Sequence, residues 1–114
     1  MHELSIVASL FDILEEKARE HGATKVVLVK LRVGKLAGVV PEFLQTAFDS
    51  YKRDTIAAEA VLEVISVPLR VKCRKCQAEA EKDDFVFSCP SCGATDLEVL
   101  EGMDLFLDKL DLEV

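Results

Sequence analysis

The 114-residue sequence contains no tryptophan, one tyrosine and only two histidines. No apolar run approaches the ~20 residues that a membrane-spanning helix needs. Residues 1–20 do contain an apolar stripe, but no basic leader precedes it and acidic residues interrupt it, so we expect no secretory signal. We therefore expect a cytoplasmic protein without a membrane partner, whose cysteines stay reduced or bind metal.

Positive charge is also scarce. The sequence has 14 Lys and Arg against 21 Asp and Glu, a net charge of -7, and residues 94–114 hold seven acids and one base. Because such a chain repels phosphate backbones, we expect no nucleic-acid partner. The sequence also lacks a Gly-rich phosphate loop, a GTPase motif and a nucleophile–base pair, so we expect a binding protein and not an enzyme.

Two amphipathic helices are predicted. Residues 4–21 carry apolar side chains at spacings of three and four, and Gly22 is a suitable end for this helix. Residues 41–53 begin with Pro41, which suits the first helical turn. We expect the first helix to bury Leu4, Val7, Leu10, Phe11, Leu14 and Ala18, and the second to bury Leu44, Ala47, Phe48 and Tyr51.

Three strands are predicted as well. Residues 60–71 form one strand, in which Pro68 marks an edge position or the strand's end. Residues 97–114 form another, bent near Gly102 or changing phase between Leu107 and Leu110. Residues 25–34, KVVLVKLRVG, are rich in β-branched residues and are expected to place on one face Val27, Val29, Leu31 and Val33.

The order of these elements predicts an α+β fold. Two helices packed on one face of a three-stranded sheet would bury both apolar helix stripes. The cysteine-containing segment lies between two strands, so we expect it to form an inserted, zinc-ribbon-like domain. The predicted division is a main α+β domain, residues 1–69 and 97–114, and an insert, residues 70–96.

The four cysteines fall within one stretch, CRKCQAEAEKDDFVFSCPSCG. Two residues separate the members of each pair, which allows a tight knuckle whose two thiolates bind one ion. Two knuckles complete a tetrahedron, the geometry of structural zinc, and leave no position for a substrate. The sequence therefore predicts a structural zinc site formed by Cys73, Cys76, Cys89 and Cys92.

The surroundings of the cysteines leave two alternatives open. A rubredoxin-like iron centre is one, because thiolates bind iron well, although the insert has only Phe85 and Phe87 as aromatic residues. The other is a zinc ribbon that binds nucleic acid or a large protein assembly, and the small basic patch VKCRKC is its only support. Three bases from this region, Lys72, Arg74 and Lys75, would equally offset the negative charge of a four-thiolate zinc centre.

The amino terminus offers a second set of metal ligands. His2 is too large for the usual removal of an initiator methionine, so we expect Met1 to keep a free amine. This amine, the His2 amide nitrogen and the imidazole Nδ1 can close two chelate rings in one plane, which suits Ni(II) or Cu(II). Glu3 could add its amide or its carboxylate. From spacing alone the signal is weak, and a solvated histidine before a helix is the ordinary alternative.

These signals combine with a resemblance. The segments MHELS, RVGKLAGVVPEFLQTAF and LEVISVP, followed by the two cysteine pairs, resemble the HypA/HybF family of hydrogenase maturation nickel metallochaperones. The resemblance runs nearly end to end, with its segments in order. It implies Ni(II) binding by Met1, His2 and Glu3 in the main α+β domain, and structural Zn(II) at the four cysteines.

The resemblance also implies partners. The nickel would pass toward the large subunit of a [NiFe]-hydrogenase with the help of a HypB-type GTPase, and some relatives also serve urease maturation. Some relatives place histidines beside the cysteine pairs, but this sequence has none there, so we expect no histidine-based change of zinc coordination. Two questions stay open: Cu(II) outranks Ni(II) at nitrogen sites, and the family permits a monomer, a dimer or exchanged segments.

Overall fold

The computed structural model describes residues 3–82 and 87–114. The chain divides into two units. One comprises residues up to Arg32, Val39–Ile65 and Phe106–Val114, and the other comprises Val33–Gly38 and Ser66–Leu105. The sequence predicted domain boundaries after residues 69 and 96. The division into these two units does not test those boundaries, so they stay a prediction.

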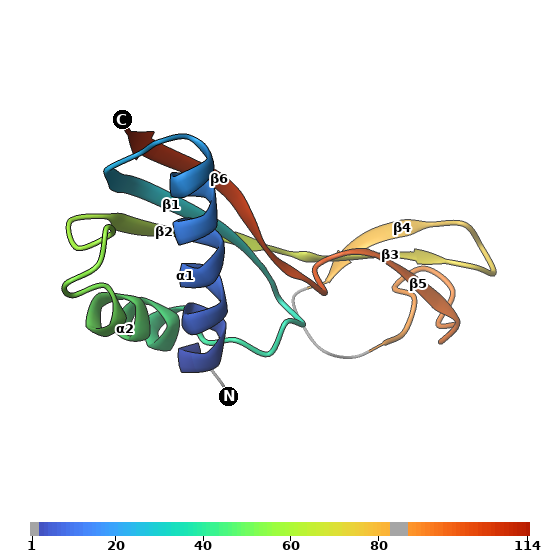
Figure 1. Ribbon diagram of the computed structural model, residues 1–114. Coiled ribbons are helices and arrows are strands. Elements are labelled where there is room, and N and C mark those ends of the chain that lie inside the picture. Colours follow the sequence, from blue (N-terminus) through green and yellow to red (C-terminus); the bar gives the residue numbers. More distant parts are fainter. Residues whose placement is uncertain (1–2, 83–86) are drawn as a thin grey trace. The chain divides into compact units, whose positions relative to one another are not determined.

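The first unit contains two helices, α1 (Glu3–Glu20) and α2 (Pro41–Tyr51), and most of a sheet with the strand order β2-β1-β6 (Figure 1). Its strands are β1 (Lys25–Gly34), β2 (Val61–Val67) and β6 (Leu105–Glu113). The predicted α+β fold, with two helices and a three-stranded sheet, is confirmed.

Three ion pairs and one hydrogen bond along this sheet reveal the direction of its strands. Lys25 contacts Glu59 and Lys30 contacts Glu63, so β1 and the segment leading through β2 run in the same direction. Thr24 contacts Glu113 and Arg32 contacts Asp108, so β1 and β6 run in opposite directions. The parallel pair is joined by α2, as a β-α-β connection requires.

The core of the first unit lies between the helices and the sheet. Phe11 of α1 is its centre: its ring lies 5.4 Å from the Phe48 ring and 4.8 Å from the Tyr51 ring, both of α2. The side chains buried around them come from α1, β1, α2 and the segment around β2, namely Val7, Leu10, Leu14, Ala18, Val26, Val29, Leu31, Leu44, Ala57, Ala60 and Leu62.

Three side chains that we expected in the core are exposed. One is Tyr51, the last residue of α2, which is 40% exposed although its ring lies against that of Phe11. Leu4 is 60% exposed, because the apolar stripe of α1 extends one turn beyond the part of the helix that is covered. Val27 is 44% exposed, whereas its neighbour Val26 is buried together with Val29. Buried residues three apart cannot share one face of a regular strand, so the alternation in β1 changes phase here.

The ends of the helices follow from backbone geometry. Gly22 has a φ of 63°, and the N–H groups of Gly22 and Ala23 donate to the carbonyls of Arg19 and Ala18. This is the pair of hydrogen bonds by which a glycine in the left-handed region ends a helix, as the sequence predicted. The second helix ends at Tyr51, two residues before the predicted end.

The second unit contains a three-stranded sheet of its own. Its strands are β3 (Leu69–Cys73), β4 (Glu79–Lys82) and β5 (Leu97–Glu101), in the order β4-β3-β5, and both pairs are antiparallel. Two strands that we predicted as continuous are therefore interrupted. Pro68 separates β2 from β3, and Gly102 lies between β5 and β6. A proline has no N–H for the ladder, which accounts for the first break.

Two glycines explain the second break. A Cβ on Gly34 would overlap the backbone of Gly102, and a Cβ on Gly102 would lie 2.7 Å from the Leu69 Cα. Backbone hydrogen bonds hold the same three segments: Leu36 N–H donates to the Gly102 carbonyl at 2.8 Å, and Lys35 N–H donates to the Val67 carbonyl at 3.0 Å. Three chain segments thus meet backbone to backbone, at a distance that only glycine permits.

Candidate metal sites

The four cysteines lie in two knuckles of the same backbone design within the second unit. In each, the N–H of the first cysteine donates to the carbonyl five residues later, and the N–H four residues later donates back to that cysteine's carbonyl. The residue that donates back has a positive φ in both knuckles. The bonds are Cys73 to Ala78 and Gln77 to Cys73 in the first knuckle, and Cys89 to Ala94 and Gly93 to Cys89 in the second.

This design brings the four sulfur atoms together. Cys73 Sγ lies 3.6 Å from Cys92 Sγ, Cys76 Sγ lies 3.6 Å from Cys89 Sγ, and all four atoms lie within 4.8 Å of one another. A tetrahedral ion with metal–sulfur bonds of ~2.3 Å would need sulfurs ~3.8 Å apart. The cluster therefore has the size and the donor set of a single four-thiolate metal site.

Backbone N–H groups point at two of the sulfurs. The Cys76 N–H donates to Cys73 Sγ, and the Ser91 N–H donates to Cys89 Sγ, each at 3.4 Å. Donors of this kind favour the thiolate over the thiol. The N–H groups of Cys92 and Ser91 lower the pKa of Cys89 to about 6, and the Cys76 N–H lowers the pKa of Cys73.

Cys76 behaves differently. The Ala78 N–H lowers its pKa, but desolvation and the neighbouring thiols outweigh that effect and raise the pKa of Cys76 to about 11. Cys73 and Cys89 therefore ionise readily, whereas ionisation of Cys76 in the same cluster is disfavoured. A bound cation would remove that disadvantage, because it neutralises the thiolates that repel one another.

Each knuckle has one buried and one exposed cysteine: Cys73 and Cys89 are buried, and Cys76 and Cys92 are exposed.

Among the three bases expected to offset the site's charge, Arg74 has a partner of its own. Its guanidinium lies 2.9 Å from the Asp96 carboxylate, and its backbone N–H donates to the Asp96 carbonyl. The role of Asp96 could not be predicted from the sequence, because an acid 22 residues away along the chain gives no local signal.

The second predicted site is only partly within the described residues. Met1 and His2 lie outside them. Glu3 is the first residue of α1 and is half-buried. Its Oε2 accepts a hydrogen bond from the Val40 N–H at 3.4 Å. Val40 precedes α2 and has no side-chain cap of its own, so Glu3 supplies the acceptor that this helix start lacks.

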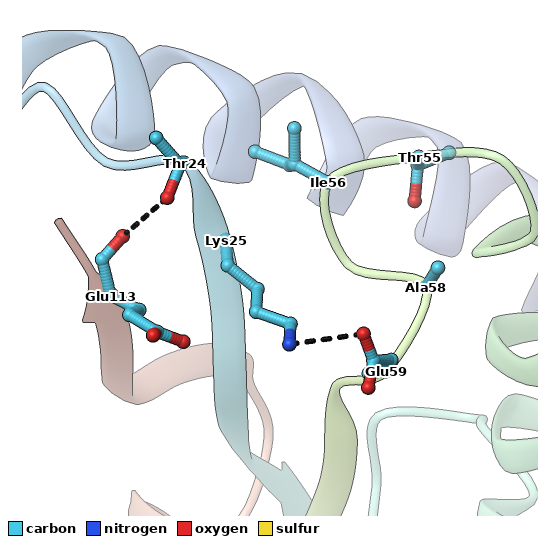
Figure 2. Close-up of a pocket in the computed structure, with 7 residues that line it drawn as sticks. All are labelled: Thr24, Lys25, Thr55, Ile56, Ala58, Glu59 and Glu113. Carbon is cyan, nitrogen blue, oxygen red and sulfur yellow. Dashed lines mark hydrogen bonds and ion pairs between the residues drawn. The ribbon is translucent and has the colours of Figure 1, made fainter.

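A pocket of about 300 Å³ lies elsewhere in the first unit, where β1 begins and β6 ends (Figure 2). Lys25 Nζ lies 3.0 Å from a Glu59 carboxylate oxygen, and this hydrogen bond raises the pKa of Lys25. The Thr24 hydroxyl donates to the Glu113 carbonyl at 3.4 Å. The charged and polar groups pair with one another across the pocket, and no cysteine or histidine lines it, so it adds no ligand to either metal site.

Within the part of the chain that the structure describes, no helix is long and apolar enough to cross a membrane.

The sequence matches a known protein family over nearly its whole length. Residues 1–112 match the family described as "Hydrogenase/urease nickel incorporation, metallochaperone, hypA". The chain belongs to the HypA family. The resemblance drawn from the sequence motifs is thereby confirmed, and with it membership of a family of nickel metallochaperones for hydrogenase maturation.

Curated members of the HypA family match over nearly their whole length. The hydrogenase maturation factor HypA of Aquifex aeolicus is 41% identical over 114 residues, which cover 100% of this chain and 99% of that protein. The HypA of Shewanella oneidensis is 41% identical over 113 residues, covering 99% of this chain and 96% of that protein.

Solved HypA structures share the fold. The solution structure of the Ni metallochaperone HypA from Helicobacter pylori has a TM-score of 0.71 and 22% identity, and the match covers 99% of this chain and 98% of that one. A second HypA solution structure has a TM-score of 0.74 at 22% identity, with 98% and 96% covered. At this identity the comparison supports the architecture alone.

Proposed function

We propose that this protein is a nickel metallochaperone that binds Ni(II) at its amino terminus and delivers it for maturation of a [NiFe]-hydrogenase. The observation that carries the proposal is the match of residues 1–112 to a nickel-incorporation family. Membership of this family supports the reading of the terminal chelate as a nickel site. The proposed nickel ligands are Met1, His2 and Glu3. In this role nickel is cargo, and the protein is a carrier and not an enzyme.

The chemistry of the terminus suits a cargo site. The Met1 amine, the His2 amide nitrogen and the His2 imidazole form two fused chelate rings, which favour the square-planar geometry of Ni(II). Glu3 has two carboxylate oxygens, and Oε2 accepts the Val40 N–H. The other oxygen remains for the ion, so Glu3 can serve nickel while it stays anchored to the start of α2.

We further propose that Cys73, Cys76, Cys89 and Cys92 hold structural Zn(II). The size of the sulfur cluster and the N–H donors to Cys73 and Cys89 support a permanent thiolate site. When bound, zinc would supply the charge that allows all four thiolates to be ionised together. A closed four-thiolate site releases its ion reluctantly, so it suits the structural role, whereas the terminal site suits transfer.

The proposed partners are a HypB-type GTPase, the [NiFe]-hydrogenase large subunit, and a urease maturation protein as a further recipient. The sequence has no phosphate loop of its own, so GTP hydrolysis would come from the partner. The proposed location is the cytoplasm, where both the thiolates and the nickel enzyme's precursor would be available.

The test is a Ni(II) titration of untagged, zinc-loaded protein and of the His2→Ala variant, with the zinc content of both measured. A native amino terminus is essential, because a tag would separate the amine from His2. We expect wild type to bind one nickel ion and His2→Ala to lose it while retaining zinc. Equal binding by both proteins would refute the terminal site. A red protein containing iron would refute the zinc assignment, and a preference for Cu(II) in competition would question the cargo.

A further inference from the structure

The four cysteine sulfurs contact one another across the two knuckles. Cys73 Sγ lies 3.6 Å from Cys92 Sγ, and Cys76 Sγ lies 3.6 Å from Cys89 Sγ. Both contacts therefore join a sulfur of the first knuckle to a sulfur of the second. A disulfide bond is about 2 Å long, so each pair could bond after its two sulfurs approach by less than that distance.

Each contact also pairs an exposed cysteine with a buried one. Cys76 and Cys92 are exposed, whereas their contacts, Cys89 and Cys73, are buried. An oxidant in solution reaches the exposed sulfur first, because the oxidation of cysteine requires access as well as thiolate character. The buried sulfur beside it is shielded from the oxidant and is placed to react with the oxidised partner.

The two contacts lie one inside the other along the chain. Cys76 and Cys89 are 13 residues apart and lie within the span from Cys73 to Cys92, which are 19 residues apart. Both bonds could therefore form in one chain, and each would close a much longer loop than a bond within a knuckle, whose cysteines are three residues apart. A cross-link over a longer loop removes more conformational freedom from the unfolded chain, so bonds between the knuckles would stabilise the fold more than bonds within them.

The second knuckle depends on a join to the rest of its unit. Residues 88–95 belong to no helix or strand, whereas Cys73 is the last residue of β3. A hydrogen bond from Lys82 Nζ to the Ser88 carbonyl, 3.0 Å long, holds only the start of this knuckle. A bound ion joins the two knuckles through the four sulfurs, and bonds between the knuckles would maintain that join after the ion has left. Bonds within the knuckles would not.

We propose that the cysteine cluster is an oxidant-responsive site, in which a hydroperoxide converts the metal-bound thiolates into two disulfides between the knuckles, Cys73–Cys92 and Cys76–Cys89, and so releases the metal. The inference rests on the proposed structural zinc. A closed four-thiolate site exchanges its ion reluctantly, but oxidation removes the negative charges that hold the ion.

The chemistry balances with hydrogen peroxide as the oxidant. The exposed thiolate attacks one peroxide oxygen, the O–O bond breaks, and a sulfenic acid forms while the other oxygen takes up a proton and leaves as water. The buried thiolate of the other knuckle then attacks the sulfenic sulfur, the S–O bond breaks, and the departing hydroxide takes up a second proton to form water. Each disulfide thus uses one peroxide, two protons and two electrons from the sulfurs. Thiols in solution would reduce the disulfides again, so the change is reversible.

The test adds hydrogen peroxide to untagged, zinc-loaded protein and measures released zinc with a colorimetric chelator, 4-(2-pyridylazo)resorcinol. We expect one zinc ion to leave each chain for two molecules of peroxide consumed. Treatment with dithiothreitol and added zinc should restore the original zinc content. A sample handled in the same way without peroxide is the control, and it should retain its zinc.

Tryptic peptides distinguish bonds between the knuckles from bonds within them. After free thiols are alkylated, trypsin cleaves at Arg74 and Lys75, inside the first knuckle, but has no site inside the second. Bonds between the knuckles would join three peptides, residues 73–74, 76–82 and 83–109, into one species. Bonds within the knuckles would instead join 73–74 to 76–82 and leave 83–109 separate.

Fragmentation of the joined species in the mass spectrometer identifies the partners. Breakage of the bond between Cys89 and Pro90 separates Cys89 from Cys92, so the two fragments show which first-knuckle cysteine each one carries. We expect the fragment with Cys92 to carry Cys73 and the fragment with Cys89 to carry Cys76.

Each other result overturns the proposal. It fails if peroxide releases no zinc before the cysteines become sulfinic acids, or if a non-reducing gel shows that the disulfides join separate chains. It also fails if the peptides show bonds within a knuckle, or the opposite pairs Cys73–Cys89 and Cys76–Cys92. If the purified protein holds iron in place of zinc, the zinc assignment fails, whereas release of that iron with the expected two disulfides would still support the oxidant-responsive site.

Discussion

Gln77 and Gly93 occupy equivalent positions in the two cysteine knuckles. Each donates its N–H to the carbonyl of the first cysteine of its pair, at 2.9 Å and 2.8 Å, and the two residues have φ angles of 66° and 77°. The left-handed region suits glycine and strains a residue that has a Cβ. The first knuckle reduces that disadvantage through a hydrogen bond from the Gln77 side-chain amide to the Arg74 carbonyl.

This equivalence predicts opposite effects for two substitutions. Gly93→Ala should destabilise the zinc-loaded protein by about 1 kcal/mol, because an added Cβ meets no neighbouring atom and only the backbone conformation is strained. Gln77→Gly should leave stability unchanged or raise it slightly, since relief of strain offsets the lost Arg74 contact. Denaturant unfolding of both variants checks this. A loss in Gln77→Gly as large as that in Gly93→Ala would contradict it.

A second prediction concerns the meeting of Gly34 and Gly102. Gly34→Ala should cost about 3 kcal/mol, because the new Cβ would overlap the Gly102 backbone, which cannot move aside as a flexible side chain would. Gly102→Ala should cost at least as much, since it adds backbone strain at a φ of 105° to a contact with Leu69. The measurement is the free energy of unfolding.

Gly38 provides the control for this pair. Its φ is 74°, and a Cβ there would meet nothing within 4 Å, so Gly38→Ala isolates the conformational cost, about 1 kcal/mol. Gly34 is not one of the described glycines that have a positive φ, so Gly34→Ala isolates the free-energy cost of the overlap. If Gly34→Ala lowered the free energy of unfolding no more than Gly38→Ala does, the three segments would not approach as closely as described.

The sequence predicted these features unevenly. Helix α1, its end at Gly22 and strand β1 were predictable, because periodicity, β-branching and left-handed glycine are local signals. The junction at Gly102 was expected only as a bend. Its partner Gly34 lies 68 residues earlier, and no local pattern indicates that two backbones will meet.

The candidate sites show the same distinction. The spacing of the cysteines predicted that they share a site, because a two-residue gap fixes local geometry. The partnerships of Arg74 with Asp96 and of Glu3 with Val40 depend on the folded chain and gave no signal. The exposure of Leu4 was missed for a related reason: periodicity identifies an apolar face but not where its cover ends.

Acid should release the metal from the cysteine cluster, because protons compete with the ion for thiolates. The pKa of Cys89 is about 6, below the ordinary thiol value, because of the N–H groups of Cys92 and Ser91. A lowered pKa means that this thiolate's contribution to stability is complete above the ordinary thiol pKa and is lost as the pH falls through about 6. Zinc transfer to a chelator should therefore increase steeply below that pH.

Circular dichroism distinguishes local release from global unfolding. Helices α1 and α2 lie in the first unit and the cysteines in the second, so the helical signal should persist while zinc is lost. Zinc retention that is insensitive to pH near 6, or loss of helix in step with zinc, would contradict the prediction.

The last prediction separates the two roles of Glu3. Glu3→Ala removes the oxygen that accepts the Val40 N–H and should destabilise the protein by at most about 1 kcal/mol, because the bond is exposed and 3.4 Å long. Glu3→Gln keeps an acceptor oxygen but removes the negative charge, so it should recover most of the stability. Nickel affinity should behave otherwise: if the carboxylate is a ligand, both variants weaken it, because a neutral amide is a poorer donor to a cation. Parallel unfolding and Ni(II) titrations of the two variants resolve the roles. Full nickel binding by Glu3→Gln would leave Glu3 as a helix cap alone, with the chelate formed by the nitrogens of Met1 and His2.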